Sequence, residues 1–242
     1  MKPAAFEYVA VRSVDEALEA LAHDGARVLA GGQSLLPLLN AREVRPTRLV
    51  DINHAGLGVI RRRDGALSIG ATVRQAALLR SSLVAEGWPL LALAARHVGT
   101  PGTRSRGTVG GSVMHADPRA ALPAALAALD ARFEHKEDLV PFKLLLGIEV
   151  PPLPKGSRAG YAQFARTAGV FPDAGAAVVL APGHVAIALL GVGRVTRAEA
   201  ALRAGATTRE TAEIAAEAVE GDHRRALVAD VIRRALEQAG RR

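Results

Sequence analysis

Two short glycine-centred segments are the features that most constrain what this chain can fold into and bind. The first glycine segment is Ala30-Gly31-Gly32-Gln33-Ser34-Leu35, and the second, about eighty residues later, is Thr108-Val109-Gly110-Gly111-Ser112. Glycine has no β-carbon, so backbone N–H groups in such segments can approach a phosphate closely, and the Ser and Thr hydroxyls can add donors. Each segment stands between an apolar run and a predicted helix. The pair therefore predicts one diphosphate held from two sides.

The better-known phosphate and catalytic motifs do not occur. The chain has no G-x-x-x-x-G-K-[ST] sequence, and neither glycine segment has the spacing of G-x-G-x-x-G. There is also no G-x-S-x-G, no H-E-x-x-H and no clustered carboxylate pair. We therefore expect neither a P-loop nor a Rossmann site, and we expect no catalytic residue and no metal ligand in this chain.

Composition narrows the class of protein. The 242 residues are 49% hydrophobic but only 3% aromatic, so the core must consist largely of Ala, Leu and Val, with Trp88 as the single tryptophan. The absence of cysteine excludes disulfides, thiolate zinc sites and a cysteine-ligated iron–sulfur cluster within the chain. Any such cluster must belong to a partner.

The charge pattern argues against nucleic acid. The formal charge is +7, but the basic residues are dispersed, and the longest run, Arg61-Arg62-Arg63, has no aromatic side chains beside it. A solvated, arginine-rich surface is the simpler interpretation. No stretch of eighteen apolar residues occurs, and no signal-peptide apolar region follows the first residues. We expect a cytoplasmic protein without membrane insertion.

Residues 1–53 predict a small β/α subdomain. Strands are expected near 6–9, 28–29 and 49–52. Ser13 is placed to cap a helix with Asp15 and Glu16 in its first turn, and Pro37 lies early in a second helix.

Residues 54–157 predict a second subdomain that ends in a linker. Asp64-Gly65 favours a hairpin turn between strands near 59–63 and 67–70, and Thr72 is a candidate helix cap. Helices are expected at 89–98 and 120–129, a loop at 100–106 and a strand at 147–150. The stretch 151–157, with three prolines and a glycine, is the best linker candidate.

Residues 158–242 predict a small sheet with helices on one side. Strands are expected at 161–166, 176–180 and 185–190, followed by two helices. Thr207 and Glu210 fit a capping box, and Leu227, Val231, Ala235 and Leu236 form an apolar stripe at helical spacing.

The sequence resembles the medium, FAD-binding subunit of molybdenum hydroxylases, a family that includes the carbon monoxide dehydrogenase medium subunit and the xanthine dehydrogenase flavin domain. The resemblance begins at A-G-G-Q-S-L-L-P-L-L-N and includes R-S-R-G-T-V-G-G-S-V-M-H-A-D-P. It extends in order over nearly the whole chain, through residues 30–40, 45–52, 69–75, 94–99, 104–118, 161–166 and 223–228.

The resemblance implies an α+β fold of three parts. Two α/β FAD-binding subdomains, 1–53 and 54–157, resemble those of the vanillyl-alcohol oxidase superfamily, and residues 158–242 form a C-terminal domain with a three-stranded antiparallel sheet and helices. The cofactor-binding residues it implies are Ala30, Gly31, Gly32, Gln33, Ser34 and Leu35 in the first segment, Thr108, Val109, Gly110, Gly111 and Ser112 in the second, and Asp117 and Leu145.

The implied activity is electron transfer in a heteromeric oxidoreductase. A large molybdopterin-binding subunit hydroxylates the substrate, a small subunit carries [2Fe–2S] clusters, and FAD on this chain passes the electrons to an external acceptor. The cofactor performs the redox chemistry. The missing cysteines fit this division between subunits.

Some residues leave alternatives open. Relatives carry Asp or Glu where this chain has Ala121, and a basic residue where it has Ala165, and the chain is shorter between Phe133 and Leu144 and around Pro182. A flavin-free scaffold or assembly protein of the same fold is therefore the alternative function. A free-standing flavin reductase fits less well, because the C-terminal half resembles the subunit family.

Single side chains near the segments also have two interpretations. Asp117 either bonds cofactor hydroxyls or caps a helix, and Leu145 either covers the flavin ring or belongs to the core. His115 is a cofactor contact or a partly buried structural histidine. Arg104 and Arg106 either neutralise phosphate or are exposed loop charges.

Overall fold

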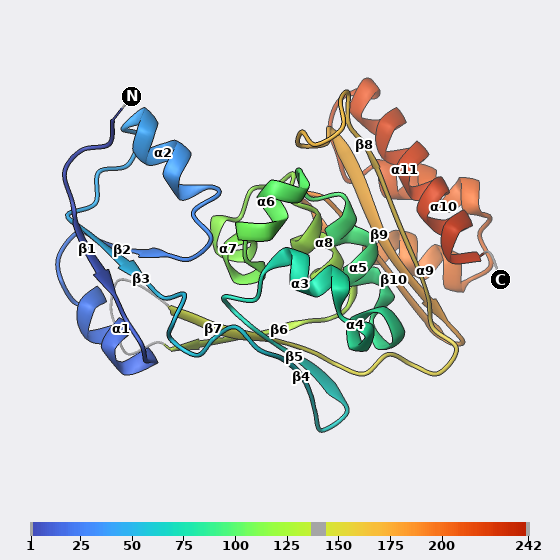
Figure 1. Cartoon of the computed structure of the whole chain (residues 1–242). Helices are drawn as coiled ribbons and strands as arrows, with labels where there is room; N and C mark the ends of the chain where they lie inside the picture. Colours follow the sequence, from blue (N-terminus) through green and yellow to red (C-terminus); the bar gives the residue numbers. More distant parts are fainter. Residues whose placement is uncertain (1, 137–143, 241–242) are drawn as a thin grey trace. The chain divides into compact units, whose positions relative to one another are not determined.

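The computed structural model describes residues 2–136 and 144–240 (Figure 1). They form two compact units, each assembled from separate stretches of the chain. The first contains the chain up to Ala77 with Pro101–His115 and Arg132–Glu149, and the second contains Leu78–Thr100, Ala116–Ala131 and the chain from Val150 onward. Residues 54–157 thus contribute to both units.

The first unit begins with a three-stranded parallel sheet in the order β1-β3-β2 (Figure 1). Its elements are β1 (Glu7–Ala10), α1 (Val14–Leu21), β2 (Ala26–Leu29), α2 (Leu35–Ala41) and β3 (Arg48–Asp51). The Ser13 side chain accepts a hydrogen bond from the amide of Glu16, which confirms the predicted cap. Ala17 and Leu21 of α1 and Val50 of β3 are buried in one apolar cluster that fixes the helix on the sheet.

A second sheet of the first unit has the order β4-β5-β7-β6, in which the pairs β4–β5 and β6–β7 are antiparallel. Its strands are β4 (Ile60–Arg63), β5 (Ala66–Gly70), β6 (Arg132–Lys136) and β7 (Leu144–Val150). The predicted hairpin is confirmed, with positive φ at Asp64 (50°) and Gly65 (83°) as this turn requires. β6 was not predicted, because its exposed, charged residues lack an apolar alternation.

Three predictions around the second glycine segment are wrong. Residues expected as a loop form helix α6 (Pro101–Arg106), and the second glycine pair lies in the first turn of helix α7 (Val109–His115) rather than in a loop. Thr72 caps no helix: α3 (Gln75–Arg80) begins three residues later, and the Thr72 hydroxyl is buried without a hydrogen-bond partner in the described part of the chain.

The second unit has an antiparallel sheet in the order β11-β10-β9-β8. The sheet consists of β8 (Arg158–Phe164), β9 (Ala174–Ala181), β10 (His184–Leu189) and β11 (Gly193–Arg194). The three predicted strands are therefore present, and the two-residue β11 adds a fourth. The helices are α4 (Ser82–Gly87), α5 (Pro89–Arg96), α8 (Ala121–Ala128), α9 (Thr196–Arg203), α10 (Thr208–Ala216) and α11 (Asp222–Gly240). Three helices follow the sheet rather than the two expected.

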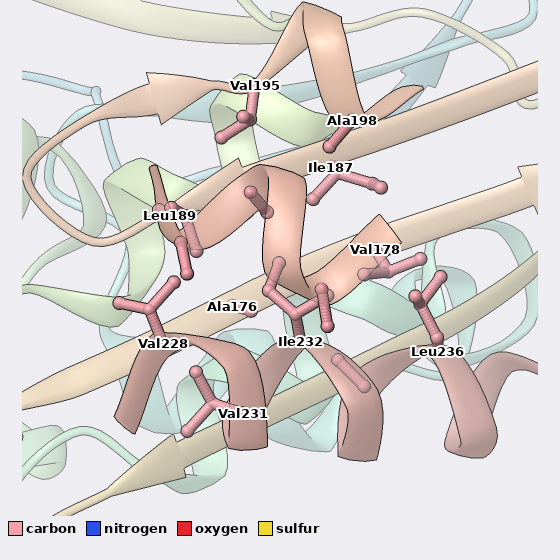
Figure 2. Packing of buried hydrophobic residues seen from close by; sticks show 14 of the residues in the cluster. Ala176, Val178, Ile187, Leu189, Val195, Ala198, Val228, Val231, Ile232 and Leu236 are labelled. Atoms are coloured by element: carbon pink, nitrogen blue, oxygen red, sulfur yellow. The ribbon is translucent and has the colours of Figure 1, made fainter. Parts of the chain in front are cut away.

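The core of the second unit lies between this sheet and its C-terminal helices. Figure 2 shows Ile232 and Leu236 of α11 directed toward the strands, and both belong to one buried cluster with Val231, Val178 and Ile187. Each such aliphatic side chain stabilises the fold by about 1.5–3 kcal/mol on full burial. The Thr207–Glu210 capping box is confirmed at the start of α10.

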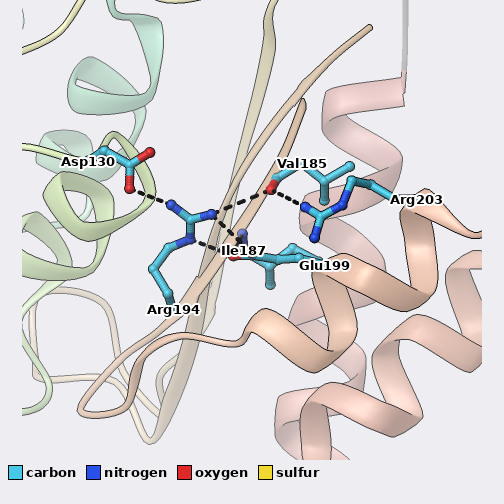
Figure 3. Close-up of polar contacts among 6 residues, drawn as sticks. All are labelled: Asp130, Val185, Ile187, Arg194, Glu199 and Arg203. Atoms are coloured by element: carbon cyan, nitrogen blue, oxygen red, sulfur yellow. Dashed lines mark hydrogen bonds and ion pairs between the residues drawn. The ribbon is translucent and has the colours of Figure 1, made fainter. Parts of the chain in front are cut away.

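A cluster of charged side chains joins β11 to α9 (Figure 3). The Glu199 side chain, only 3% exposed, accepts hydrogen bonds from the Ile187 amide (2.9 Å) and from Arg194 Nη2 (2.8 Å). Arg194 also donates to Asp130, beyond the C-terminal end of α8. Burial alone would raise the pKa of Glu199, but the bonds from Arg194 and Ile187 outweigh it and leave this pKa below its usual value.

The buried indole of Trp88 binds a backbone carbonyl far along the chain. Trp88 is 2% exposed and donates its indole N–H to the Pro151 carbonyl (2.8 Å), as a core anchor should. Among residues 2–136 and 144–240, no helix is long and apolar enough to cross a membrane. The same residues contain no group of three His, Cys, Asp or Glu side chains that could hold a metal ion.

Candidate functional site

The two glycine segments lie side by side in the first unit. A β-carbon on Gly31 would stand 2.4 Å from the Arg106 carbonyl oxygen and 2.8 Å from the Gly107 α-carbon. Gly32 has φ of +72°, a conformation that costs other residues energy. Glycine is therefore required here both for the close approach of two backbones and for the turn.

The backbone amides of the first segment are free to bind a ligand. Within the described residues, the N–H groups of Gly31, Gly32, Gln33 and Ser34 donate to no acceptor of the chain. Ser34 precedes α2, yet its side chain makes no capping hydrogen bond. Several unpaired donors in one turn are suited to bind an anion.

The second segment uses its amides internally. The N–H groups of Val109 and Gly110 donate to the carbonyls of Val73 (2.9 Å) and Ala71 (3.0 Å). The Gly111 amide donates to Thr108 Oγ1 (3.0 Å), and the Ser112 amide to the Thr108 carbonyl (3.2 Å). We expected both segments to offer free amides to a phosphate. In the structure only the first segment does so.

Close packing explains the glycines of the second segment. A β-carbon on Gly110 would lie 2.6 Å from the Ala71 carbonyl oxygen, and one on Gly111 would lie 2.7 Å from Thr108 Oγ1. Gly110 allows helix α7 to approach the segment that follows β5, and Gly111 leaves room for the Thr108 hydroxyl at the start of the same helix. The second segment thus supports the first, whose Gly31 packs against the backbone of Arg106, Gly107 and Thr108.

A continuous chain of hydrogen bonds connects the first segment to the backbone just before the second segment. Asn53 Nδ2 donates to the carbonyl of Ala30 (2.9 Å), and Arg74 Nη2 donates to Asn53 Oδ1 (2.8 Å). Arg74 Nη1 donates to the carbonyl of Arg106. The first segment and the residue that precedes Gly107 are thereby held by the same two side chains.

Asp51 fixes Asn53 from the other side. The Asp51 carboxylate accepts from the Asn53 amide (2.9 Å), from Asn53 Nδ2 (2.6 Å) and from the Tyr8 hydroxyl (2.6 Å). Burial acts to raise the pKa of Asp51, but the hydrogen bonds from Tyr8 and Asn53 lower it overall. Asp51 is therefore ionised at neutral pH and orients the Asn53 amide toward Ala30.

Arg74 carries a half-buried charge. No carboxylate in the described ranges lies within ion-pair distance of its guanidinium, whose partners are the neutral oxygens of Asn53 and Arg106. A cation without an acidic partner next to unpaired amides gives this region a positive potential. The donors and the charge together suit a phosphate or diphosphate.

Sequence reasoning did not identify Asn53, Arg74 or Gln75 as part of this region. Gln75 is 5% exposed, its Nε2 lies 3.4 Å from the Thr108 carbonyl, and its Oε1 has no partner within the described part of the chain. Arg74 and Gln75 lie in residues 69–75, one of the stretches that resemble the FAD-binding family. That resemblance was the only sign in the sequence that they belong to the site.

The other predicted residues have separate surroundings. Asp117 belongs to the second unit, where its carboxylate accepts from the Arg119 amide (2.8 Å) and pairs with the Arg119 guanidinium (3.0 Å). The residue that caps α8 is Ala120, so Asp117 stabilises the preceding turn instead. Leu145 lies in β7 of the first unit and is 3% exposed, as a core leucine would be.

The charged residues near the second segment are more open. His115 and Arg106 are exposed, so the expectation of a partly buried His115 is wrong. Arg104 is partly buried in α6. The Arg106 backbone, not its side chain, contacts the first segment.

The chain is similar to several known proteins. Residues 4–146 match the family described as the FAD-binding domain in molybdopterin dehydrogenase. The chain is 43% identical over 202 residues to the 6-hydroxypseudooxynicotine dehydrogenase complex subunit alpha of Paenarthrobacter nicotinovorans, covering 74% of this chain and 68% of that protein. It is 32% identical over 282 residues to the carbon monoxide dehydrogenase medium chain of Hydrogenophaga pseudoflava, covering 99% and 98%.

A solved structure shows the same fold. A chain of the Hydrogenophaga pseudoflava carbon monoxide dehydrogenase that lacks the Mo-pyranopterin moiety superposes with a TM-score of 0.91 at 33% identity, covering 99% of both chains.

Proposed function

Because this chain belongs to the family of FAD-binding medium subunits of molybdenum hydroxylases, we propose that it holds FAD by its diphosphate at the first glycine segment and relays electrons through it. The observation that carries the proposal is the row of unpaired amides at Gly31, Gly32, Gln33 and Ser34. Those donors lie within the matched range 4–146. They have the chemistry that a diphosphate requires.

The residues divide into donors and supports. The amides of residues 31–34 and the Ser34 hydroxyl bind the diphosphate, and Thr108 and Ser112 add hydroxyls from the second segment. Ala30 and Leu35 continue the first segment at its two ends, and Val109, Gly110 and Gly111 support it through their packing.

FAD, when bound, supplies the redox chemistry of this subunit, because it can accept and release electrons singly or in pairs. The chain itself needs no acid or base for that task. Its residues bind the diphosphate, orient the cofactor and set the electrostatic environment through Arg74 and the unpaired amides.

The source and the destination of the electrons lie outside this chain. It has no cysteine, so a [2Fe–2S] donor must be carried by a small partner subunit, and a large molybdopterin-binding subunit would oxidise the substrate. An external acceptor then takes the electrons. The relatives named above are themselves described as a complex subunit and a medium chain, which supports a heteromeric assembly.

Reconstitution tests the proposal. The purified chain is titrated with FAD, and bound flavin is measured by its visible absorbance after removal of free cofactor. We expect stoichiometric yellow protein, with no binding of riboflavin, which lacks the diphosphate. Failure to retain FAD, even in excess cofactor and with the partner subunits present, would refute the proposal.

That negative result would favour a flavin-free scaffold. The resemblance motivates this second function, because the family usually carries a carboxylate where this chain has Ala121, the first residue of α8 and 5% exposed. A scaffold would still assemble with the partner subunits but would carry no flavin, so co-purification of a complex that releases no FAD on denaturation identifies it.

A further inference from the structure

We propose that Asn53 and Arg74 are positioning residues that set the spacing of the two glycine segments before any cofactor binds. The inference deepens the FAD site proposed above, although its first test requires no FAD. Neither side chain needs to touch the cofactor. They act on the backbone that does.

Three hydrogen bonds run from the Ala30 carbonyl through Asn53 and Arg74 to the Arg106 carbonyl. We call these bonds the Asn53–Arg74 bracket. Ala30 precedes the first unpaired amide, and Arg106 is the residue against which Gly31 packs. The bracket therefore spans the place where the segments meet. Asn53 and Arg74 are 21 positions apart in the chain, so only the tertiary fold brings them together.

Both side chains are themselves held in place. Asn53 is fixed by two bonds to the Asp51 carboxylate. Arg74 forms an isolated antiparallel bridge with Thr108, and the flanking Gln75 amide donates to the Gly107 carbonyl (2.9 Å). A side chain anchored at its backbone in this way loses little further freedom when it binds.

Position 74 requires arginine because its side chain donates hydrogen bonds to two acceptors at once. The planar guanidinium directs Nη1 to Arg106 and Nη2 to Asn53, a geometry that the single ammonium of lysine does not reproduce. Arg74→Lys therefore keeps the charge but breaks the bracket. This variant separates positioning from a purely electrostatic role, in which Lys would substitute for Arg.

The first test is amide hydrogen exchange of the ligand-free chain. We expect Arg74→Lys, Arg74→Gln and Asn53→Ala to raise exchange at the Gln75 and Val109 amides by about tenfold, since one charge-assisted bond is lost. Arg61→Lys, on exposed strand β4, is the matched control and should change nothing. Circular dichroism checks that each variant folds. If the Arg74 variants do not fold, the exchange result for Asn53→Ala tests the bracket instead.

The second test measures binding of FAD and of ADP, which carries the diphosphate without a flavin. Arg74→Lys should weaken both by about tenfold with an unchanged salt dependence, because the charge remains. Normal exchange and normal affinity in Arg74→Lys would overturn the bracket. If wild type binds neither ligand while the exchange changes appear, the proposed FAD site fails and the bracket stands.

Discussion

The α-carbon of Gly31 lies so close to the carbonyl of Arg106 that a β-carbon would stand 2.4 Å from that oxygen. This contact joins two segments that are far apart in the sequence. It places unpaired amides of one segment beside the hydroxyl-bearing second segment, and it explains why alanine cannot replace this glycine.

Gly31→Ala should therefore lose cofactor affinity. The methyl group meets backbone that cannot move freely, so the segments must separate, and we expect FAD affinity to fall by more than about tenfold and stability by about 1–3 kcal/mol. Gly58→Ala is the control, because its β-carbon would lie at an ordinary 3.5 Å from Thr72 Oγ1. Flavin retention of both variants is compared; equal retention would show that the contact is irrelevant to binding.

Gly110 and Gly111 should differ in what their replacement costs. Gly110→Ala directs a methyl group at the backbone of Ala71, whereas Gly111→Ala meets only the Thr108 side chain, which can rotate away. We expect Gly110→Ala to cost about 1–3 kcal/mol and Gly111→Ala less. Urea unfolding measures both, and the reverse order would contradict the packing role assigned to the second segment.

Replacing Ser13 should change the stability of the fold, whereas replacing Ser34 should change the affinity for FAD. Ser13→Ala removes the cap of α1 and should lower stability by about 1 kcal/mol without changing FAD affinity. Ser34→Ala removes a hydroxyl that makes no capping bond, so it should weaken FAD binding without lowering stability. A stability loss in Ser34→Ala equal to that in Ser13→Ala would assign Ser34 to the fold instead.

Glu199 should make folding sensitive to acid. Its folded-state pKa is lowered, so its stabilisation is complete above its unfolded-state pKa and disappears as the pH falls through the folded-state value. Glu199→Gln should cost about 2 kcal/mol near pH 7, and the difference from wild type should shrink as the pH falls below about 4.3, the usual pKa of a glutamate. Unfolding in urea across this range measures it.

The exposed Glu213, paired with Arg209 one turn away on α10, provides the control for that prediction. Glu213→Gln should change stability by less than about 0.5 kcal/mol at any pH. If the two variants responded alike, the buried position of Glu199 would not be the cause.

The features predicted correctly from sequence are local ones. The Ser13 cap, the Asp64-Gly65 turn and the Thr207–Glu210 box each depend on residues within a few positions of one another. Strand β6 and helix α6 were missed because their polar sequences lack an apolar period, and tertiary contacts decide their structure.

The candidate site was predicted only in part for the same reason. The glycine segments are visible in the sequence, but the partners of the Val109 and Gly110 amides lie at Val73 and Ala71, more than thirty residues earlier. The different roles of the two segments, and the Asn53–Arg74 bracket between them, therefore required the fold.

Amide hydrogen exchange with and without FAD tests the central claim most directly. In the ligand-free chain the amides of residues 31–34 should exchange rapidly, while those of Gly110, Gly111 and Ser112 are already protected. FAD should slow exchange at residues 31–34 by at least about tenfold, because each donor gains a phosphate oxygen. Bound FAD with no added protection at residues 31–34 would contradict the account.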